Sequence, residues 1–155
     1  MAKVLLNVPL VPQSKSLTCW HASALMLWYY WQGKTGYQGP MYTIPNKWEN
    51  NQPVTPQEFI TLANNVGLTA LPLANQYSSD DLGKHLGNCG PLWSAGYWFG
   101  YGHIVVLTGV DGNTIHYNDP EHGGSRKTGT VSWFNTKLAS QLPGCLMYKD
   151  PKGGY

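Results

Sequence analysis

The most apolar stretch of the chain lies near its start, where hydrophobic side chains recur on nearly every helical face of residues 19–31. No Gly or Pro interrupts this stretch, and the polar residues 13–16 lie before it. Thr18 is a favourable N-cap, so we expect a helix that begins at Cys19. Because a helix that is hydrophobic all round is usually buried, the pattern predicts a central helix with a cysteine in its first turn.

Two amphipathic stretches predict shorter helices further along the chain. Thr55, Pro56 and Glu58 have the spacing of a capping box with proline at the first helical position. One apolar stripe follows, and Gly67 supplies the stop. A third helix is expected at residues 78–86, where serines and aspartates form the first turn.

The second half of the chain carries the strand signals. Residues 103–110 form an apolar run, and Asp111-Gly112 is a hairpin signal that leads to a return strand at residues 114–117. With helices first and an antiparallel sheet second, the fold class is α+β. Other expected elements are strands at 90–98, 129–133 and 145–148, a helical piece at 135–138, an edge strand or extended lead-in at 4–11, and a surface loop at 33–51.

Length and composition suit one globular domain spanning residues 1–155. Hydrophobic residues make up 42% of the chain against 12% charged residues, so a packed core is expected. The net charge of +2 comes without a cluster of Lys or Arg, and nucleic acid is therefore not an expected partner. No stretch approaches the roughly 18 apolar residues of a membrane span, and the start lacks the apolar core and cleavage site of a signal peptide.

The three cysteines, Cys19, Cys89 and Cys145, are odd in number and widely spaced, which is typical of neither a disulfide framework nor a zinc site. At least one thiol is therefore free. In the first turn of a helix, Cys19 would meet free backbone N–H groups and the positive end of the helix dipole, which favour the nucleophilic thiolate. The alternative is a small apolar core residue, as we expect for Cys89 and Cys145.

The predicted hairpin supplies a base and an orienting group. His103 begins one strand, and Asn118 and Asp119 follow its partner. Pairing across the tight turn brings these ends together, because the two arms are of nearly equal length. An amide or a carboxylate would then orient the imidazole as a general base, provided that this end of the sheet packs on the start of the Cys19 helix. Gln13 lies in the preceding loop, where its amide and the Cys19 backbone N–H would form an oxyanion hole.

Four short motifs follow one another along the chain. Residues 8–13 read VPLVPQ, residues 18–20 read TCW, residues 102–106 read GHIVV with Gly109 shortly after, and residues 118–120 read NDP. Together they resemble the papain-like cysteine peptidase superfamily, and within it the compact bacterial branch of C39-like peptidases and secreted papain-fold effectors or toxins. The resemblance implies a papain-like fold, in which a central helix bearing the nucleophile packs on an antiparallel β-sheet.

The resemblance also implies a role for each site residue. Cys19 would be the nucleophile of a thioester acyl-enzyme, His103 the general base and acid, Asp119 the orienting group and Gln13 the oxyanion donor. Asn118 is the alternative third member, because larger papain-like peptidases use Asn where the compact branch uses the Asp of its DP element. No cofactor or metal is implied.

Two other interpretations fit the same residue types. His103, His116, His122 and Asp119 could ligate a metal, but their spacing matches no known ligand pattern, so we expect none. The 7 Trp and 10 Tyr residues could instead mark a non-catalytic, aromatic-rich binding module. In a peptidase, the substrate cleft is expected to be lined by aromatic residues beside the cysteine and before the histidine, namely Trp20, Tyr97, Trp98 and Tyr101.

The resemblance extends to the biological role. A stand-alone peptidase of this length, without a pro-segment or transporter domain, would act uncontrolled in its own cell, which favours a secreted antibacterial or host-directed toxin or effector. Such a chain would be made in the bacterial cytoplasm without a cleaved signal peptide, exported by a secretion system, and restrained by an immunity or inhibitor protein covering the cleft. Its substrate would be a protein or peptide cut after small residues such as Gly-Gly. Alternatives are a leader-peptide processing peptidase and a peptidoglycan amidase.

Overall fold

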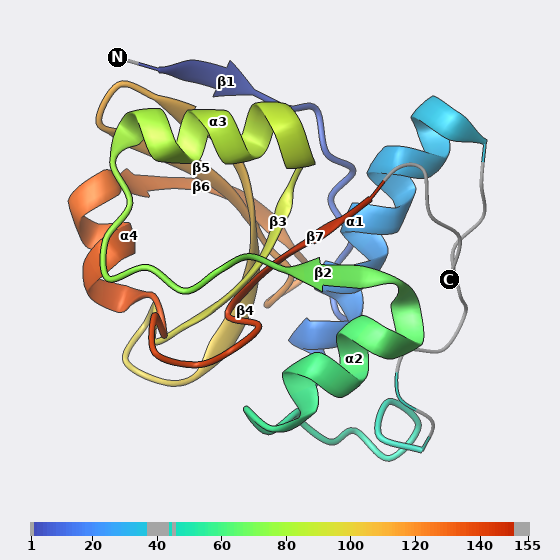
Figure 1. Ribbon diagram of the computed structural model, residues 1–155. Helices are drawn as coiled ribbons and strands as arrows, with labels where there is room; N and C mark the ends of the chain where they lie inside the picture. The colour runs from blue at the N-terminus through green and yellow to red at the C-terminus, as the bar shows by residue number, and fades with distance from the viewer. Residues whose placement is uncertain (1, 37–43, 45, 151–155) are drawn as a thin grey trace.

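The computed structural model of the chain describes residues 2–36, 44 and 46–150, which fold into helices packed on an antiparallel β-sheet (Figure 1). The sheet has 7 strands in the order β2-β7-β3-β4-β5-β6, with β1 paired to β4 beside this path. This arrangement confirms the predicted α+β class. In chain order the elements are β1 (Lys3–Leu5), α1 (Cys19–Thr35), α2 (Glu58–Val66), β2 (Leu68–Ala70), α3 (Ser79–Cys89), β3 (Leu92–Gly96), β4 (His103–Asp111), β5 (Thr114–Asp119), β6 (Ser125–Thr130), α4 (Val131–Lys137) and β7 (Leu146–Lys149).

Helix α1 begins at Cys19 as predicted and continues to Thr35, about one turn past its expected end. A single glycine in its last turn does not stop it, and Gly36 ends it in the left-handed conformation at φ 78°. Thr18 does not cap the helix through its side chain. Its hydroxyl instead donates to the Lys15 carbonyl at 3.1 Å, so the first-turn N–H groups are left without that side-chain acceptor.

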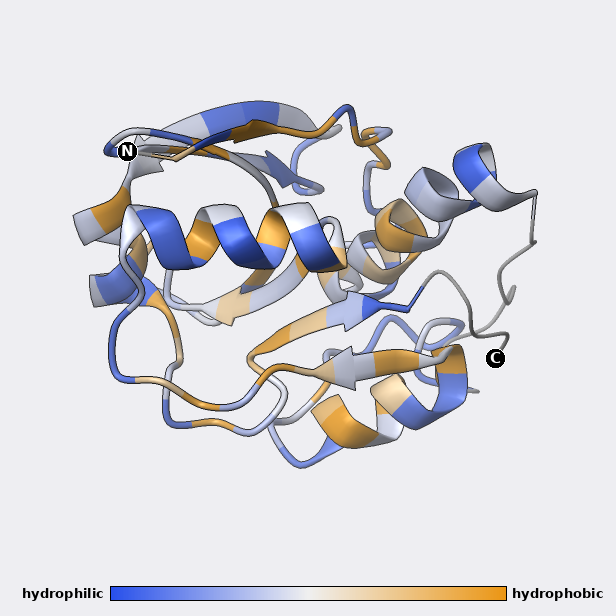
Figure 2. Cartoon of the chain, turned by 45° about the horizontal axis from the view of Figure 1, so that its top comes forward, coloured by the Kyte–Doolittle hydropathy of each residue, from blue (hydrophilic) through white to orange (hydrophobic). Residues whose placement is uncertain are grey.

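Side-chain hydrogen bonds lie at the start of both α2 and α3, but only α3 has a side-chain cap. At α2 the Glu58 carboxylate accepts from the backbone N–H and the hydroxyl of Thr55 at 2.9 and 3.0 Å. The Thr55 hydroxyl thus donates instead of capping, and the helix begins at Glu58 rather than at Pro56. At α3, Ser78 and Asp81 form a full capping box. Figure 2 shows hydrophilic and hydrophobic bands alternating along α3, as expected for a helix with one side on the sheet.

The strand predictions are right in the centre of the sheet and wrong at one edge. Strands β3, β4, β5 and β7 lie within a few residues of the expected positions. Residues 129–133 were expected to form a strand, but β6 ends at Thr130 and α4 begins at Val131. The Thr130 hydroxyl accepts the Trp133 backbone N–H at 2.9 Å, and this cap starts the helix.

Segments with weak sequence signals differ most from prediction. The edge strand expected at residues 4–11 is confined to β1, which pairs with the end of β4. Strand β2 was not predicted, because three residues are too short for a periodic signal. The surface loop expected at residues 33–51 lies partly outside the described residues, at positions 37–43 and 45.

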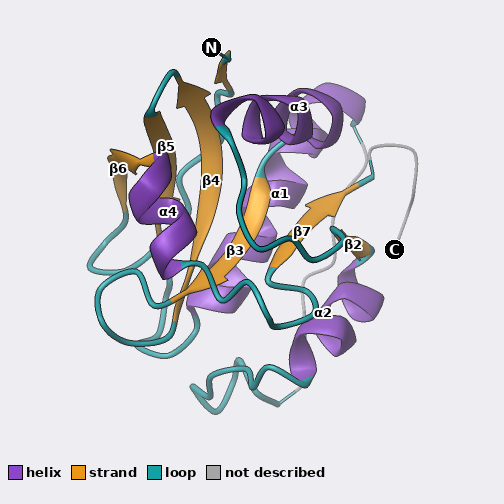
Figure 3. Ribbon diagram, turned by 60° about the vertical axis from the view of Figure 1, so that its left-hand side comes forward, coloured by secondary structure: helices purple, strands orange, loops and turns teal. Residues whose placement is uncertain are grey.

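The sheet and α1 together position the candidate site. Helix α1 lies behind the sheet in Figure 3, while α3 and α4 lie in front of it. The Trp93 indole N–H of β3 donates to the Trp20 carbonyl at 3.1 Å, which ties the first turn of α1 to the sheet. The start of α1 thereby shares a groove with the start of β4.

Helix length and apolarity also bear on membranes. Within the described ranges of the chain, no helix combines the length and the apolarity that crossing a membrane requires.

Candidate active site

Cys19 and His103 line the same groove, one from the start of α1 and the other from the start of β4. The groove has a volume of about 230 Å³, and apolar side chains such as Val54 and Phe59 form much of its lining. Cys19 is half-buried. The helix therefore holds the cysteine in place while leaving it open to the groove.

His103 is 6% exposed and lines the same groove as Cys19. Its Nε2 lies 2.8 Å from Asp119 Oδ1. Burial lowers the pKa of His103, but the interactions with Asp119 and Cys19 and the negative charges of both groups outweigh burial and raise the pKa to about 9. The imidazole is therefore coupled electrostatically to both side chains.

Asp119 reaches His103 diagonally across the hairpin. The β4–β5 register pairs Val106 with Asn118, which sets Asp119 level with Val105 rather than with His103. Diagonal neighbours on one face of a sheet are within reach of long side chains. The expectation of nearly equal arms is therefore wrong: β4 has 9 residues and β5 has 6, with a register shift between Leu107 and Gly109.

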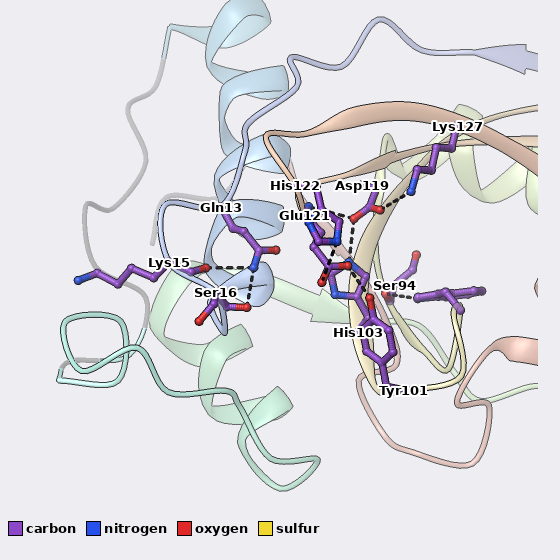
Figure 4. A network of polar contacts seen from close by, with 11 residues as sticks. Gln13, Lys15, Ser16, Ser94, Tyr101, His103, Asp119, Glu121, His122 and Lys127 are labelled. Carbon is purple, nitrogen blue, oxygen red and sulfur yellow. Dashed lines mark hydrogen bonds and ion pairs between the residues drawn. The ribbon is translucent and has the colours of Figure 1, made fainter.

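Both carboxylate oxygens of Asp119 are hydrogen-bonded in its 1% exposed position (Figure 4). Oδ1 also accepts the Glu121 backbone N–H at 3.0 Å, and Oδ2 accepts from the Lys127 ammonium at 2.8 Å. Burial raises the pKa of Asp119, but the hydrogen bonds from His103, Lys127 and Glu121 outweigh it and lower the pKa to about 2. The carboxylate is therefore ionised at neutral pH.

Asn118, the alternative third member, is bonded elsewhere. Its amide donates to the Val8 carbonyl at 3.2 Å and lies 3.6 Å from the sulfur of Met26. The geometry favours Asp119 as the partner of His103.

Gln13 lies in the loop before α1, where its backbone N–H donates to the Pro120 carbonyl at 2.9 Å. Its side-chain amide donates to the carbonyls of Lys15 and Ser16 at 3.0 and 2.8 Å. Figure 4 shows the amide nitrogen pointing at these carbonyls and not at His103. Gln13 Oε1 is buried without a hydrogen-bond partner among the described residues. The role of oxyanion donor stays a prediction, and it requires the amide to turn over.

The four aromatic residues expected in the cleft divide into three groups. Trp20 and Tyr97 line the groove, although the Trp20 side chain is otherwise buried. The placement of Trp98 in the cleft is wrong, because it is 2% exposed and its ring stacks on Phe134 of α4. Tyr101 does not line the groove, and its ring lies 6.0 Å from that of His103.

The sequence matches the family described as papain-like cysteine protease AvrRpt2 over residues 2–139. The chain belongs to this family. It is a papain-like cysteine peptidase, as its four motifs predicted.

A solved structure similar to this cysteine peptidase is the crystal structure of a double glycine motif protease from an AMS/PCAT transporter in complex with the leader peptide. The two are 18% identical, the alignment covers 96% of each chain, and the TM-score is 0.56. This likeness supports the papain-like fold. None of the curated proteins matches the chain significantly.

Sequence reasoning missed Glu121, which lies against the peptidase's histidine. Its carboxylate accepts the Tyr101 hydroxyl at 2.6 Å and lies 3.8 Å from His103 Nε2. This hydrogen bond is the first reason that the pKa of Tyr101 is raised to about 12, with burial and the nearby negative charges adding to it. The one available signal was the position of Glu121 two residues after Asp119.

One group of the described residues has the geometry to hold a metal ion. His103, Asp119 and Glu121 each offer a ligand atom, and these atoms lie within 4.8 Å of one another. His116 is not part of this group, and the His122 side chain is 85% exposed. His116 and His122 therefore do not join His103 and Asp119 in the metal group considered from the sequence. The hydrogen bond between His103 and Asp119 already engages two of the three groups.

Burial shifts the pKa values of Cys89, Cys145 and His21, which are not among the proposed catalytic residues. Burial raises the pKa of Cys145 to about 11, and it also raises the pKa of Cys89. Burial lowers the pKa of His21 to about 4, against a smaller opposing effect of a nearby glutamate. The His21 ring lies 5.7 Å from that of Trp20 and 5.2 Å from that of Trp48. At neutral pH these two thiols are protonated and His21 is neutral.

Proposed function

We propose that the chain is a single-domain endopeptidase in which Cys19, His103 and Asp119 cleave peptide bonds through a thioester acyl-enzyme. The observation that carries this proposal is the position of His103, which is hydrogen-bonded to Asp119 and lines the same groove as Cys19. Membership of the papain-like cysteine protease family supports it.

In the first half-reaction, His103 takes the proton of the Cys19 thiol, and the thiolate attacks the carbonyl carbon of the bound peptide. Asp119 holds the imidazole and stabilises its positive charge. The imidazolium then gives its proton to the departing amine, and a thioester remains on Cys19. In the second half-reaction, the imidazole takes a proton from water, the hydroxide attacks the thioester, and the returned proton restores the thiol.

The oxyanion formed in each half-reaction needs hydrogen-bond donors beside Cys19. The Cys19 backbone N–H belongs to the first turn of α1 and has no partner within the helix. Gln13 would supply the second donor once its amide turns away from Lys15 and Ser16. The bond from the Gln13 backbone to Pro120 supports this role, because it keeps the loop beside the turn that follows Asp119.

The specificity that we propose is cleavage after small residues such as Gly-Gly. The groove holds only about 230 Å³, and it is lined beside the cysteine by Trp20 and Tyr97. A volume of this size suits few side chains of a peptide. The structural likeness to a double glycine motif protease supports the same specificity.

The biological role that we propose is that of a secreted antibacterial or host-directed toxin or effector, restrained by an immunity or inhibitor protein over the groove. Its support is the resemblance of the four motifs to secreted papain-fold effectors. Processing of a leader peptide is the second candidate, favoured by the leader peptide bound to the structural neighbour.

The peptidase assignment is tested by incubating a proteome with the chain or with its Cys19→Ala variant and sequencing the new N-termini. We expect cuts with the parent chain only, preceded by glycine or another small residue. A broad range of bulky residues before the cuts would refute the proposed specificity alone. Equal cutting by Cys19→Ala would refute the peptidase assignment itself.

The two biological roles are separated by expressing the parent chain and its Cys19→Ala variant in bacterial and in host cells. Growth arrest that depends on Cys19 supports the toxin role. Unaffected growth, together with cleavage of a leader peptide, supports the processing role.

A further inference from the structure

Lys127 lies on β6 opposite Tyr117, and its side chain reaches back to the proposed catalytic groups. Its ammonium lies 2.8 Å from Asp119 Oδ2 and 4.6 Å from the centre of the Phe99 ring. The Phe99 ring lies 5.8 Å from the His103 ring. Lys127 is partly exposed, whereas Asp119 is buried. A cation at the surface thus contacts a carboxylate inside the site.

The hydrogen bonds of Asp119 are divided between its two oxygens. Oδ1 accepts from His103 and from the Glu121 backbone. Oδ2 accepts from Lys127, its one donor in the described part of the chain. A buried carboxylate oxygen without a donor is strongly unfavourable, and a donor on the second oxygen further restricts rotation of the carboxylate. Lys127 therefore fixes the carboxylate plane that carries Oδ1 to the imidazole.

We propose that Lys127 is a positioning residue of the peptidase, which acts through Asp119 to hold the His103 imidazole in line with Cys19. This inference rests on the function proposed above for those three residues. No step of the reaction passes a proton through Lys127. Its effect on turnover comes from the orientation and the charge of Asp119.

The ammonium also moderates the charge that His103 experiences. Lys127 offsets part of the negative charge of Asp119, so its removal leaves the imidazolium beside a more negative partner. The carboxylate separates the ammonium from the ring, and at such a separation a unit charge in water is worth roughly half a pH unit. Loss of this charge should therefore raise the pKa of His103. The other groups that face the ring keep their identity in such a variant, namely Cys19, Tyr101 and Glu121.

The test compares Lys127→Met with Lys127→Arg, which keeps the charge and the donor. Lys84→Met is the matched control, because Lys84 is an exposed lysine on α3. Two quantities are measured: the kinetic constants on a cleaved peptide, and the titration of the His103 ring nitrogens by NMR, which needs no substrate.

The expected result is that Lys127→Met lowers kcat about tenfold with little change in KM, and raises the His103 titration midpoint by about half a unit. Lys127→Arg restores most of kcat and the parent midpoint. Lys84→Met changes neither quantity.

Unchanged kcat and an unchanged His103 midpoint in Lys127→Met would overturn the inference. A lower thermal unfolding midpoint with no movement of the His103 titration would do the same, since it indicates a purely structural ion pair. If Lys127→Met does not fold, Lys127→Gln takes its place, because it keeps a donor without the charge. A raised His103 titration midpoint in Lys127→Gln supports the inference, and an unchanged midpoint overturns it. A failure of the proposed function is distinguishable, because it shows as full activity in Cys19→Ala and leaves the NMR titration readable.

Discussion

Asp119 and Cys19 both favour the charged form of His103, although His103 is almost fully buried. Burial alone would make the imidazole neutral. The aspartate beside it is itself held ionised by Lys127 and by the Glu121 backbone. The charge state of the histidine therefore depends on contacts that extend beyond the three proposed catalytic side chains.

We predict that kcat/KM falls as the pH rises through about 9, the pKa to which His103 is raised. The imidazolium gives its proton to the departing amine, and above this pKa that proton is absent. Initial rates of cleavage of a peptide across the alkaline pH range measure this decrease, the alkaline limb of the pH profile. A limb centred near 6.5, the ordinary histidine value, would contradict the coupling to Asp119 and Cys19.

Separate substitutions of the neighbouring Asp119 and Asn118 decide which one orients the histidine. Asp119→Ala should lower kcat by about a hundredfold to ten-thousandfold, because the imidazole loses its orienting partner. Asn118→Ala should keep kcat and lower the free energy of unfolding by about 1–2 kcal/mol, because a buried hydrogen bond to Val8 is lost. Kinetics and urea unfolding of both variants check this. The reverse pattern would assign the role to Asn118.

At the scale of elements, the site depends on one helix start and one hairpin. The sequence located both, because an uninterrupted apolar run and an Asp-Gly turn are strong local signals. The diagonal contact between His103 and Asp119 was beyond local signals, since the register shift in β4–β5 appears only when the strands pair. The order of the motifs along the chain thus predicted that His103 and Asp119 meet, but not that they meet diagonally.

The misplacement of Trp98 shows the limit of position along the chain as a signal. Trp98 was expected in the cleft because it lies shortly before His103. In the structure its ring stacks on Phe134 of α4 at 5.4 Å. This contact joins segments far apart in the sequence, so local signals could not reveal it.

The neighbours Tyr97 and Trp98 provide a matched test of cleft against core. Trp98→Ala should lower the free energy of unfolding by about 3–5 kcal/mol, because a buried indole is removed. Tyr97 is 55% exposed and lines the groove, so Tyr97→Ala should raise KM. Its effect on stability should stay within about 0.5 kcal/mol. Urea unfolding and peptide kinetics measure both, and equal destabilisation by the two variants would contradict this division.

At the scale of the whole molecule, the buried ion pair links stability to pH. The pKa of His103 is raised from 6.5 to about 9, so its stabilising effect is complete below 6.5 and is lost as the pH rises to 9. The pKa of Asp119 is lowered from 3.8 to about 2, so its effect is complete above 3.8 and is lost as the pH falls to 2. Stability from this pair is therefore greatest between those two ranges.

We predict that the free energy of unfolding, measured in urea, falls by about 3 kcal/mol between pH 6 and pH 9.5. His103→Ala should remove most of this decrease, because the titrating group is gone. An equal decrease in the parent and in His103→Ala would show that other groups cause it.

The parts of the site that sequence could not predict come from distant strands and from side-chain orientation. Lys127 lies on β6, and only the pairing of β6 with β5 brings it to Asp119. Gln13 was singled out by its place before the cysteine, but the direction of its amide depends on the carbonyls of its own loop. Motif order predicts which residue types meet, whereas packing decides their contacts.

The central claim is that Cys19 forms a thioester with the substrate during turnover. Rapid acid quenching of the peptidase with a cleaved peptide, followed by mass spectrometry of its fragments, measures this directly. We predict a mass increase equal to the N-terminal part of the substrate on the fragment that contains Cys19, and none in Cys19→Ala. The claim would be contradicted if Cys19→Ala turned over the substrate without forming an adduct. An adduct on another residue of the parent chain would also contradict it.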